Sequence, residues 1–512
     1  MDWFAGLVLA GTILVALAIC LNIPAFLYTY YRQLRISKRL DHSGAPTHWL
    51  LGNIPYMLAY DDEERYRRWT TRVQKTGAKL ERLWMGPTYM IVELYHPDTV
   101  RKVLKEPKDK NIYRLLKPWI GDGLLVSGGK KWFCNRRLLT AAFHCNILKP
   151  YTQVSNSCLE ILLDEWQRSA GKNEPVKVFD SISYLTLDIL LRCVFSYKSD
   201  CQRTRDKAPY IKAVYKLLQL VVKRSLKILH FFDMIYWLSS DGREMKRNCQ
   251  LVHEHSERVV QKRKKALGLA DIDGDCDRAL EVAKQQRKYL DFLDILLTAT
   301  DEDGNGLTDS EIKDEVDTFM FEGHDTTTSG ISWTLYCLAK YPEHQEKIRD
   351  EVRSVLMGRE CLEYDDLKDL KYTQWCIKEA MRLYPPVLQL YRKLSKDIEL
   401  DGVMVPQGTN TIINIPALHR HPDIWKSPDE YDPLRFHPSN ADGRDPYAYL
   451  PFSAGHRNCI GQNFALNEAR TVIATIVNKF HLSLVPGNHV APLPMGVLKS
   501  CNDILFNLEP HI

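Results

Sequence analysis

The longest apolar stretch of the chain lies at its N-terminus, where residues 3–31 contain no charged side chain. A basic cluster follows it directly: Arg32, Arg35, Lys38 and Arg39. About 20 apolar residues cross a bilayer as a helix, whereas a cleaved signal peptide has a shorter apolar region and a basic start. The pattern therefore predicts an uncleaved transmembrane signal-anchor at residues 1–31. The basic cluster after it predicts a cytosolic body by the positive-inside rule.

Residues 32–59 connect this anchor to the rest of the chain. Between Asp41 and Pro55, glycines and prolines recur too often for a helix to continue. We therefore expect a basic, Pro/Gly-containing hinge at 32–59 between the anchor and the rest of the chain, whose length fits either about three domains or one large fold.

Beyond residue 60 the apolar positions recur mostly at helical spacing, with short strand-like runs at Tyr89–Glu93 and Thr411–Ile415. The longest predicted helix begins after Thr308, whose spacing to Glu311 matches a capping box. No proline interrupts it before Pro342, so it can extend for ~48 Å and must cross the whole body. The pattern predicts a mainly α protein with a small β region.

Composition narrows the class of protein. With 45% hydrophobic and 26% charged residues, the 512-residue chain resembles an average globular protein rather than a disordered or multispan one. A net charge of +5 is too small to indicate a nucleic-acid partner. The 13 cysteines are odd in number and form no Cys-x-x-Cys pair, so we expect reduced thiols rather than disulfides or a zinc ribbon.

One run resembles the start of a calcium-binding loop: Asp301-x-Asp303-x-Asn305-Gly306. Such a loop requires a bidentate glutamate at its twelfth position, which is Ile312 here. An apolar side chain cannot complete the coordination shell, so the pattern predicts a polar interhelix loop.

Polar residues interrupt the apolar middle of the long predicted helix. Glu322 and Thr326 are four residues apart and share one helix face, and Asp325 flanks the same site. One interpretation is structural, with a threonine that bonds the carbonyl four residues earlier and acids satisfied by neighbours. The other is functional: Gly323 and Thr326 open a gap for a small ligand and water, and Asp325 and Thr326 conduct protons. The pattern alone leaves both open.

A second motif, Glu379-x-x-Arg382, lies on one face of the helix predicted over Tyr372–Leu383. An exposed ion pair at this spacing is common and contributes only a few tenths of a kcal/mol. Taken alone, this motif is weak evidence for any particular function.

The third motif surrounds Cys459. A lone cysteine is usually a small buried hydrophobe. This one lies in a glycine-bounded loop before the helical run Gln462–Lys479, so backbone N–H groups and a helix N-terminus can stabilise a thiolate. Gly455 and Gly461 permit a tight turn and the close approach of a flat cofactor. Arg457 can pair with a carboxylate of that cofactor.

The sequence Phe452-x-x-Gly-x-Arg457-x-Cys459-x-Gly461 resembles the cysteine-loop signature of the cytochrome P450 haem-thiolate monooxygenases. Other motifs of that family occur in the expected order: Trp132-x-x-x-Arg136, Gly323-x-Asp325-Thr326, Glu379-x-x-Arg382 and Pro433-x-Arg435-Phe436. The resemblance covers essentially the whole chain.

This resemblance implies the cytochrome P450 fold, a triangular, mostly helical body with a small β-rich region and haem b between the long helix and the cysteine loop. Residues 60–512 would then form the haem-thiolate catalytic domain. The implied roles are Cys459 as the axial metal ligand, Thr326 and Asp325 as catalytic residues, and Trp132, Arg136, Arg392, Arg457, Phe452 and Gly461 as cofactor-binding residues. It also implies that Arg435 joins Glu379 and Arg382 in a structural network.

Residues 319–327 resemble family 4, the fatty-acid omega-hydroxylases and their relatives. Glu322 is diagnostic, since in many of these enzymes the equivalent glutamate is esterified to a haem methyl. The chain departs from the family-4 pattern at His456, where proline is common, and at Leu434, where glutamate is usual. Neither residue is the ligand, although His456 could change hydrogen bonding beside the thiolate.

The resemblance also implies partners. We expect NADPH electrons from a separate cytochrome P450 reductase on the endoplasmic reticulum membrane, with cytochrome b5 as a second candidate donor, and a lipophilic substrate together with O2. Candidate docking residues are Lys130, Lys131 and Arg137, which are equally consistent with a solvated helix end. Candidate pocket segments are Ile112–Leu125 and Leu388–Tyr391.

Two other classes of function remain open. A haem-thiolate isomerase that rearranges peroxides needs neither a proton relay nor external electrons. A non-catalytic haem-binding sensor needs only Cys459. The presence of Asp325 and Thr326 favours the monooxygenase.

Overall fold

The computed structural model describes residues 23–511 except 25, 37, 39, 41–46, 50, 86–88, 205–208, 269–289 and 301–305. Most of the expected anchor and of the calcium-like motif lies outside these residues. Among the residues described, no helix is both long enough and apolar enough to span a membrane.

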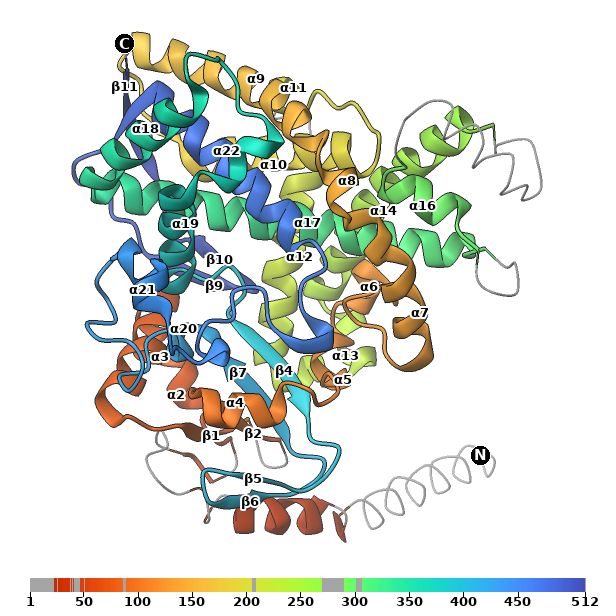
Figure 1. Cartoon of the computed structure of the whole chain (residues 1–512). Helices are drawn as coiled ribbons and strands as arrows, with labels where there is room; N and C mark the ends of the chain where they lie inside the picture. The colour runs from red at the N-terminus through yellow and green to blue at the C-terminus, as the bar shows by residue number, and fades with distance from the viewer. Residues whose placement is uncertain are drawn as a thin grey trace.

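Long helices make up most of the body, and a smaller β-rich region lies at one side of them (Figure 1). The long helices are α3 (Asp62–Thr76), α7 (Gly129–Thr140), α9 (Tyr151–Gly171), α10 (Val178–Val194), α12 (Pro209–Leu226), α14 (Ser240–Ala266), α17 (Asp309–Lys340), α18 (Glu343–Leu356), α19 (Lys371–Leu383) and α22 (Gln462–Lys479). The shorter α-helices are α2 (Ile54–Leu58), α4 (Pro97–Val103), α5 (Lys110–Tyr113), α6 (Lys117–Ile120), α8 (Cys145–Leu148), α11 (Cys201–Thr204), α13 (Asp233–Leu238), α16 (Phe292–Thr298), α20 (Ile415–Leu418) and α21 (Pro438–Ala441). The 3-10 turns are η1 (Ala141–Phe143), η3 (Ile228–Phe231), η4 (Tyr364–Lys368), η5 (Pro433–Phe436), η6 (Pro446–Ala448) and η7 (Gly455–Arg457).

The strands form small sheets. The largest has the order β1-β2-β7-β4, with β2 and β7 parallel and the other neighbours antiparallel. The strands are β1 (Leu80–Trp84), β2 (Met90–Leu94), β3 (Val176–Lys177), β4 (Gln389–Lys393), β5 (Ile398–Leu400), β6 (Val403–Val405), β7 (Asn410–Asn414), β8 (Phe480–Leu484), β9 (Pro492–Met495), β10 (Val497–Ser500) and β11 (Leu505–Pro510). Both strand-like runs predicted from the sequence are therefore strands, shifted by one residue, and the mainly α class is confirmed.

The long helix α17 matches its prediction at both ends. Thr308 Oγ1 accepts the backbone N–H of Glu311 at 3.3 Å, and the Glu311 carboxylate accepts that of Thr308 at 3.1 Å. The helix is buried on nearly all sides because α10, itself almost entirely buried, packs along it. At Gly323 a Cβ atom would lie only 2.6 Å from Leu190 Cδ1. The glycine thus permits α10 to pack closely against α17. Gly323 and Thr326 also line the cavity described below, so a cavity does lie beside this part of the helix.

The described part of the expected hinge packs against the β-rich region. Ile36 and Leu40 are buried in one cluster with Trp84 of β1. The Arg32 guanidinium donates to the backbone carbonyl of Gln407 at 2.7 Å. These residues are therefore anchored to the body.

The Glu379–Arg382 pair is fully buried, in contrast to the exposed pair that its spacing suggests. Two bonds of 2.8 Å join the guanidinium to the carboxylate. Arg382 also donates to the carbonyls of His419 and Glu430, and Arg435 Nε lies 3.3 Å from Glu379 Oε1. The expected structural network is confirmed. It ties α19 to the chain that leads into the cysteine loop.

Candidate cofactor and substrate site

The cysteine loop closes on itself immediately before α22. The Cys459 backbone N–H donates to the carbonyl of Phe452 at 2.9 Å, and Gly455 takes a φ of 71°, which favours glycine. Burial, followed by the charge of Glu322, raises the pKa of the Cys459 thiol to about 12, whereas the Gly461 backbone N–H lowers it. Coordination to a metal ion deprotonates such a thiol outright.

A cavity of about 400 Å3, which we name the Cys459 cavity, lies between this loop and α17. Nearly all the cofactor and catalytic residues expected from the sequence line it: Trp132, Arg136, Glu322, Thr326, Arg392, Phe452, Arg457, Cys459 and Gly461. Residues from segments more than 300 positions apart thus meet at one site.

Basic side chains gather at one edge of the cavity. Arg136 donates to the carbonyl and to the side-chain oxygen of Asn458, both at 2.9 Å. Arg457 donates to the carbonyl of Ser127 at 3.0 Å and stacks over the Trp132 ring, 3.8 Å from its centre. Neutral groups hold these two cations in place, namely backbone carbonyls, the Asn458 side chain and an indole.

The crowding of these charges affects the pKa of Arg457. Burial lowers the pKa of Arg457 to about 10, and the positive charges of Arg392 and Arg136 contribute to this shift. A ligand carrying two carboxylates would neutralise this edge. Haem carries two propionates and can take a thiolate ligand such as Cys459, so the residues present fit haem.

Sequence reasoning missed Lys108, which also lines the cavity and donates to the carbonyl of Leu125. Burial lowers its pKa to about 7, opposed by Glu322, while burial raises the pKa of Glu322 to about 7, opposed by Lys108. In the sequence Lys108 belongs to a polar run that is typical of a surface. A β-bridge between Lys108 and Arg392 brings it inside, and no local pattern predicts that pairing.

Thr326 faces the Cys459 cavity, and its Oγ1 donates to the Glu322 carbonyl one turn earlier at 2.8 Å. The structural interpretation of this threonine is therefore confirmed. It does not exclude the functional one, because a hydroxyl can rotate to a ligand on the same face.

Asp325 does not line the cavity. One residue from Thr326 on a helix, it is rotated by about 100°. Its Oδ1 accepts from Lys499 Nζ at 2.9 Å, and Oδ2 has no hydrogen-bond partner among the described residues. Lys499 in turn stacks over the ring of Tyr215. The expectation that Asp325 flanks the same site as Glu322 is thus corrected by helix geometry.

Apolar side chains form the remaining walls of the cavity. Both pocket segments expected from the sequence contribute, with Ile112, Leu115, Leu116, Leu124, Leu390 and Tyr391. Sequence reasoning missed the contributions of α10, α12 and β10: Leu190, Val194, Leu218, Val221, Val222 and Val497. Only tertiary packing brings these elements together. The lining is suited to a lipophilic molecule.

Comparison with known proteins identifies the family. Residues 43–505 match the family model described as Cytochrome P450. Cytochrome P450 4B1 of Rattus norvegicus is 41% identical over 483 residues, covering 94% of this chain and 92% of the relative. An ultra-long-chain fatty acid omega-hydroxylase of Homo sapiens is 43% identical, with coverages of 90% and 87%, and cytochrome P450 4F4 of Rattus norvegicus is 44% identical, with 90% and 88%.

These relatives agree with the site. A cysteine loop, a cationic edge and an apolar cavity against one long helix are assembled in a chain that matches the family over most of its length. The chain belongs to the cytochrome P450 family and is a monooxygenase of the family-4 type.

Proposed function

We propose that this protein hydroxylates the terminal carbon of fatty acids or related lipids, inserting one oxygen atom of O2 into a C–H bond. The observation that carries the proposal is the apolar cavity that Glu322 and Thr326 line together with Cys459. The similarity to a fatty acid omega-hydroxylase supports the substrate class.

Different residues would hold different parts of the cofactor. Cys459 would ligate the iron, and the basic edge would bind the propionates through Arg136, Arg392 and Arg457, with Trp132 beside them. A thiolate-ligated haem supplies the O–O cleavage that monooxygenation requires. The hydroxyl of Thr326 can hold a proton at its Oγ1 within the cavity. Its apolar walls exclude water and orient the substrate.

Glu322 would limit the position at which the bound substrate can be attacked. We propose that the Glu322 carboxylate would hold the haem through an ester bond to one of its methyl groups, with turnover in the presence of O2 supplying the oxidant. A buried carboxylate is costly to keep ionised, and the ester removes its charge. By fixing the cofactor in the cavity, Glu322 would favour attack at the chain end.

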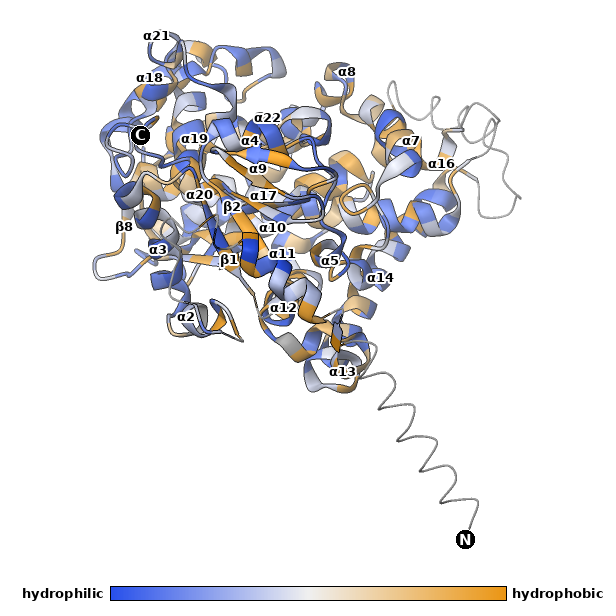
Figure 2. Ribbon diagram, turned by 90° about the horizontal axis from the view of Figure 1, so that it is seen from below, coloured by the Kyte–Doolittle hydropathy of each residue, from blue (hydrophilic) through white to orange (hydrophobic). Residues whose placement is uncertain are grey.

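We further propose that the protein is held at the endoplasmic reticulum membrane by the single-pass anchor at residues 1–31, with its catalytic domain cytosolic. An exposed apolar surface supports this proposal. It is formed by η3 and α13, and α13 lies at the rim of the molecule in Figure 2. Its exposed side chains are Leu229, Phe232, Met234, Ile235, Trp237 and Leu238. Such a patch is suited to the lipid interface.

Electrons would come from NADPH through a separate cytochrome P450 reductase, with cytochrome b5 as a second donor. Lys130 and Arg137 are exposed on α7, which also carries the cavity residues Trp132 and Arg136. Lys131 is partly buried and lies 3.5 Å from Asp122. A basic surface so close to the cavity suits an acidic flavoprotein.

The test is reconstitution of the full chain with cytochrome P450 reductase in vesicles and a panel of fatty acids of increasing length. We expect omega-hydroxy acids that depend on NADPH and on the reductase. Turnover of a lipid hydroperoxide without NADPH would instead indicate the isomerase. Intact haem binding with no conversion of any lipid would indicate the sensor. Neither alternative is supported by the relatives described above.

A further inference from the structure

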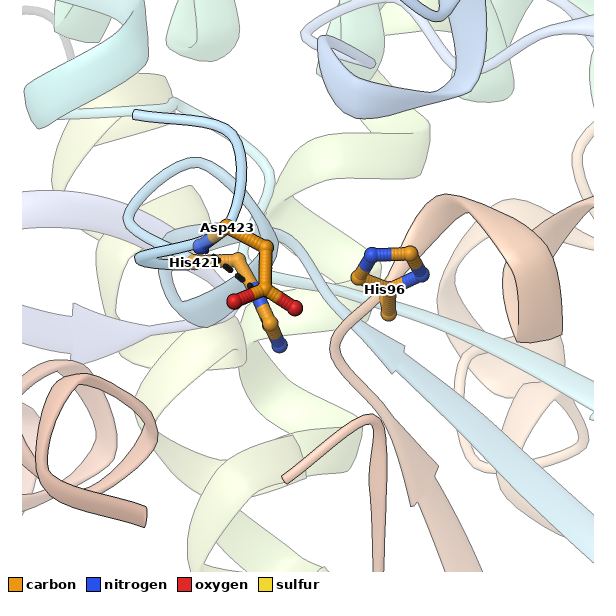
Figure 3. A group of neighbouring side chains, drawn as sticks. All are labelled: His96, His421 and Asp423. Carbon is orange, nitrogen blue, oxygen red and sulfur yellow. Dashed lines mark hydrogen bonds and ion pairs between the residues drawn. The ribbon is translucent and has the colours of Figure 1, made fainter. Parts of the chain in front are cut away.

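Three potential metal ligands gather outside the Cys459 cavity (Figure 3). His96 follows β2 and is the N-cap of α4. His421 and Asp423 lie in the turn after α20. None of the three lines the cavity. The two segments are more than 300 residues apart in the sequence, so only the fold brings them together.

The geometry of the cluster is close to that of a metal site. One ligand atom from each residue lies within 4.8 Å of the other two, and the two imidazole centres are 4.8 Å apart. Tetrahedral zinc, with bonds of about 2.1 Å, needs ligand atoms about 3.4 Å apart. The His421 ring is fully buried and fixed, whereas the Asp423 side chain is 59% exposed and has room to rotate inward.

The surroundings suit a cation. His96 Nδ1 accepts the Asp98 backbone N–H at 3.2 Å and lies 3.3 Å from its carboxylate, which leaves Nε2 available to a metal. On metal binding the ring proton would move to Nδ1, which would give up the bond from the Asp98 N–H and donate instead to the Asp98 carboxylate, as in carboxylate–histidine–metal arrangements. Asp401 adds a negative charge, and Lys79, 2.8 Å from Asp98, is the opposing cation.

We propose that His96, His421 and Asp423 bind a divalent transition-metal ion, with Zn2+ preferred, at a site separate from the Cys459 cavity. Two imidazole nitrogens and one carboxylate oxygen are a ligand set that zinc favours over magnesium or calcium. Solvent would complete the shell on the side of Asp423. The ion would fasten the β2–α4 turn to the segment after α20 and stabilise the folded chain by mass action.

The proposal is tested on the haem-containing full chain by calorimetric titration with Zn2+ and with Mg2+. The wild-type protein should bind one zinc ion at a high-affinity site, which we call the tight class, and should show no comparable binding of Mg2+. His96→Gln and Asp423→Asn should each lower the affinity of that site for zinc by ~100-fold. The temperature at which the haem-thiolate spectrum is lost should rise with zinc in wild type and not in these variants.

Two control variants distinguish zinc binding at this site from zinc binding at histidines on the surface. His489 is exposed and contacts Glu63, and His144 adjoins the Cys145 thiol at 3.6 Å. His489→Gln and His144→Gln should retain the tight zinc class. Unchanged zinc affinity in both His96→Gln and Asp423→Asn would overturn the proposal, as would loss of the tight class in the controls alone. Equally tight binding of Mg2+ would also contradict it, since that would exclude a nitrogen-based site. These variants lie outside the catalytic cavity, so the result is independent of the proposed function.

Discussion

Asp325 and Lys499 form a buried ion pair in which Oδ1 and Nζ are 2.9 Å apart. Thr326, the next residue after Asp325, faces the Cys459 cavity instead. Two neighbouring residues of one motif therefore have different environments. Asp325 joins α17 to β10, and Thr326 belongs to the cavity.

Removing one partner of this pair should destabilise the fold. Lys499→Met would leave the Asp325 carboxylate buried without its cation, at a cost of about 3–5 kcal/mol. Equilibrium unfolding in urea measures the loss. The double variant Asp325→Asn/Lys499→Met should lose less stability than Lys499→Met alone, because no uncompensated charge is left. The single variant Asp325→Asn completes the comparison. A loss of stability in the double variant that equals the sum of the losses in the two single variants would show that the pair is not coupled.

Cys459→His should abolish the thiolate-type absorption of the reduced, carbon-monoxide-bound protein, because imidazole donates less electron density than a thiolate. Cys501→Ser, a change at an exposed cysteine, is the control and should leave the absorption band unchanged. Persistence of the band in Cys459→His would assign the ligand to another residue.

Thr326→Ala should leave haem content intact and reduce the fraction of consumed NADPH that appears as hydroxylated product. The reason is the loss of a hydroxyl that can hold a proton in the cavity. Thr334→Ala is the matched control, since Thr334 also bonds the carbonyl four residues earlier, at 2.6 Å, but does not line the cavity. If the fraction of consumed NADPH that appears as product is the same in the two variants, Thr326 is not part of the proton path.

Glu322→Ala should make all haem extractable into acidified organic solvent, whereas wild type after turnover should retain a fraction bound to protein. The same change should shift oxidation from the terminal methyl toward inner carbons, because attack at the stronger terminal C–H bond needs tight positioning. Both results are measured by mass spectrometry, of protein-bound haem and of products.

Glu315→Gln is the control for Glu322. Glu315 is buried on the same helix but accepts from the Leu124 amide at 3.0 Å and from Asn135 at 2.8 Å. This variant should keep the haem adduct. Complete extraction of haem from wild type after many turnovers would exclude the ester and leave the monooxygenase assignment in place.

Glu468 should make stability depend on pH. Both its carboxylate oxygens lack a hydrogen-bond partner among the described residues, and burial raises its pKa well above the usual value. An acid with a raised pKa in the folded state costs nothing below its unfolded pKa, and the cost grows as pH rises above that value. Glu468→Gln should therefore stabilise the protein more at about pH 8 than at about pH 5. Urea unfolding at both pH values measures this, with the exposed Glu160→Gln as control. A gain that is equal at both pH values would mean that Glu468 does not titrate differently in the folded state.

Local patterns predicted those parts of the site that are set by neighbours in the chain. The capping box at Thr308, the uninterrupted α17 and the glycine-bounded loop at Cys459 each follow from short-range sequence. The burial of the Glu379–Arg382 pair did not, because the spacing of two charges says nothing about what packs over them.

What the sequence determined by itself is the family, the mainly α class and the identity of the thiol, because each rests on residue types at fixed local spacing. The tertiary structure decided which face of α17 meets the Cys459 cavity, and hence that Asp325 pairs with Lys499. It also brought Lys108 inside the cavity. Contacts between segments hundreds of residues apart depend on how helices and strands pack, and no local periodicity encodes them.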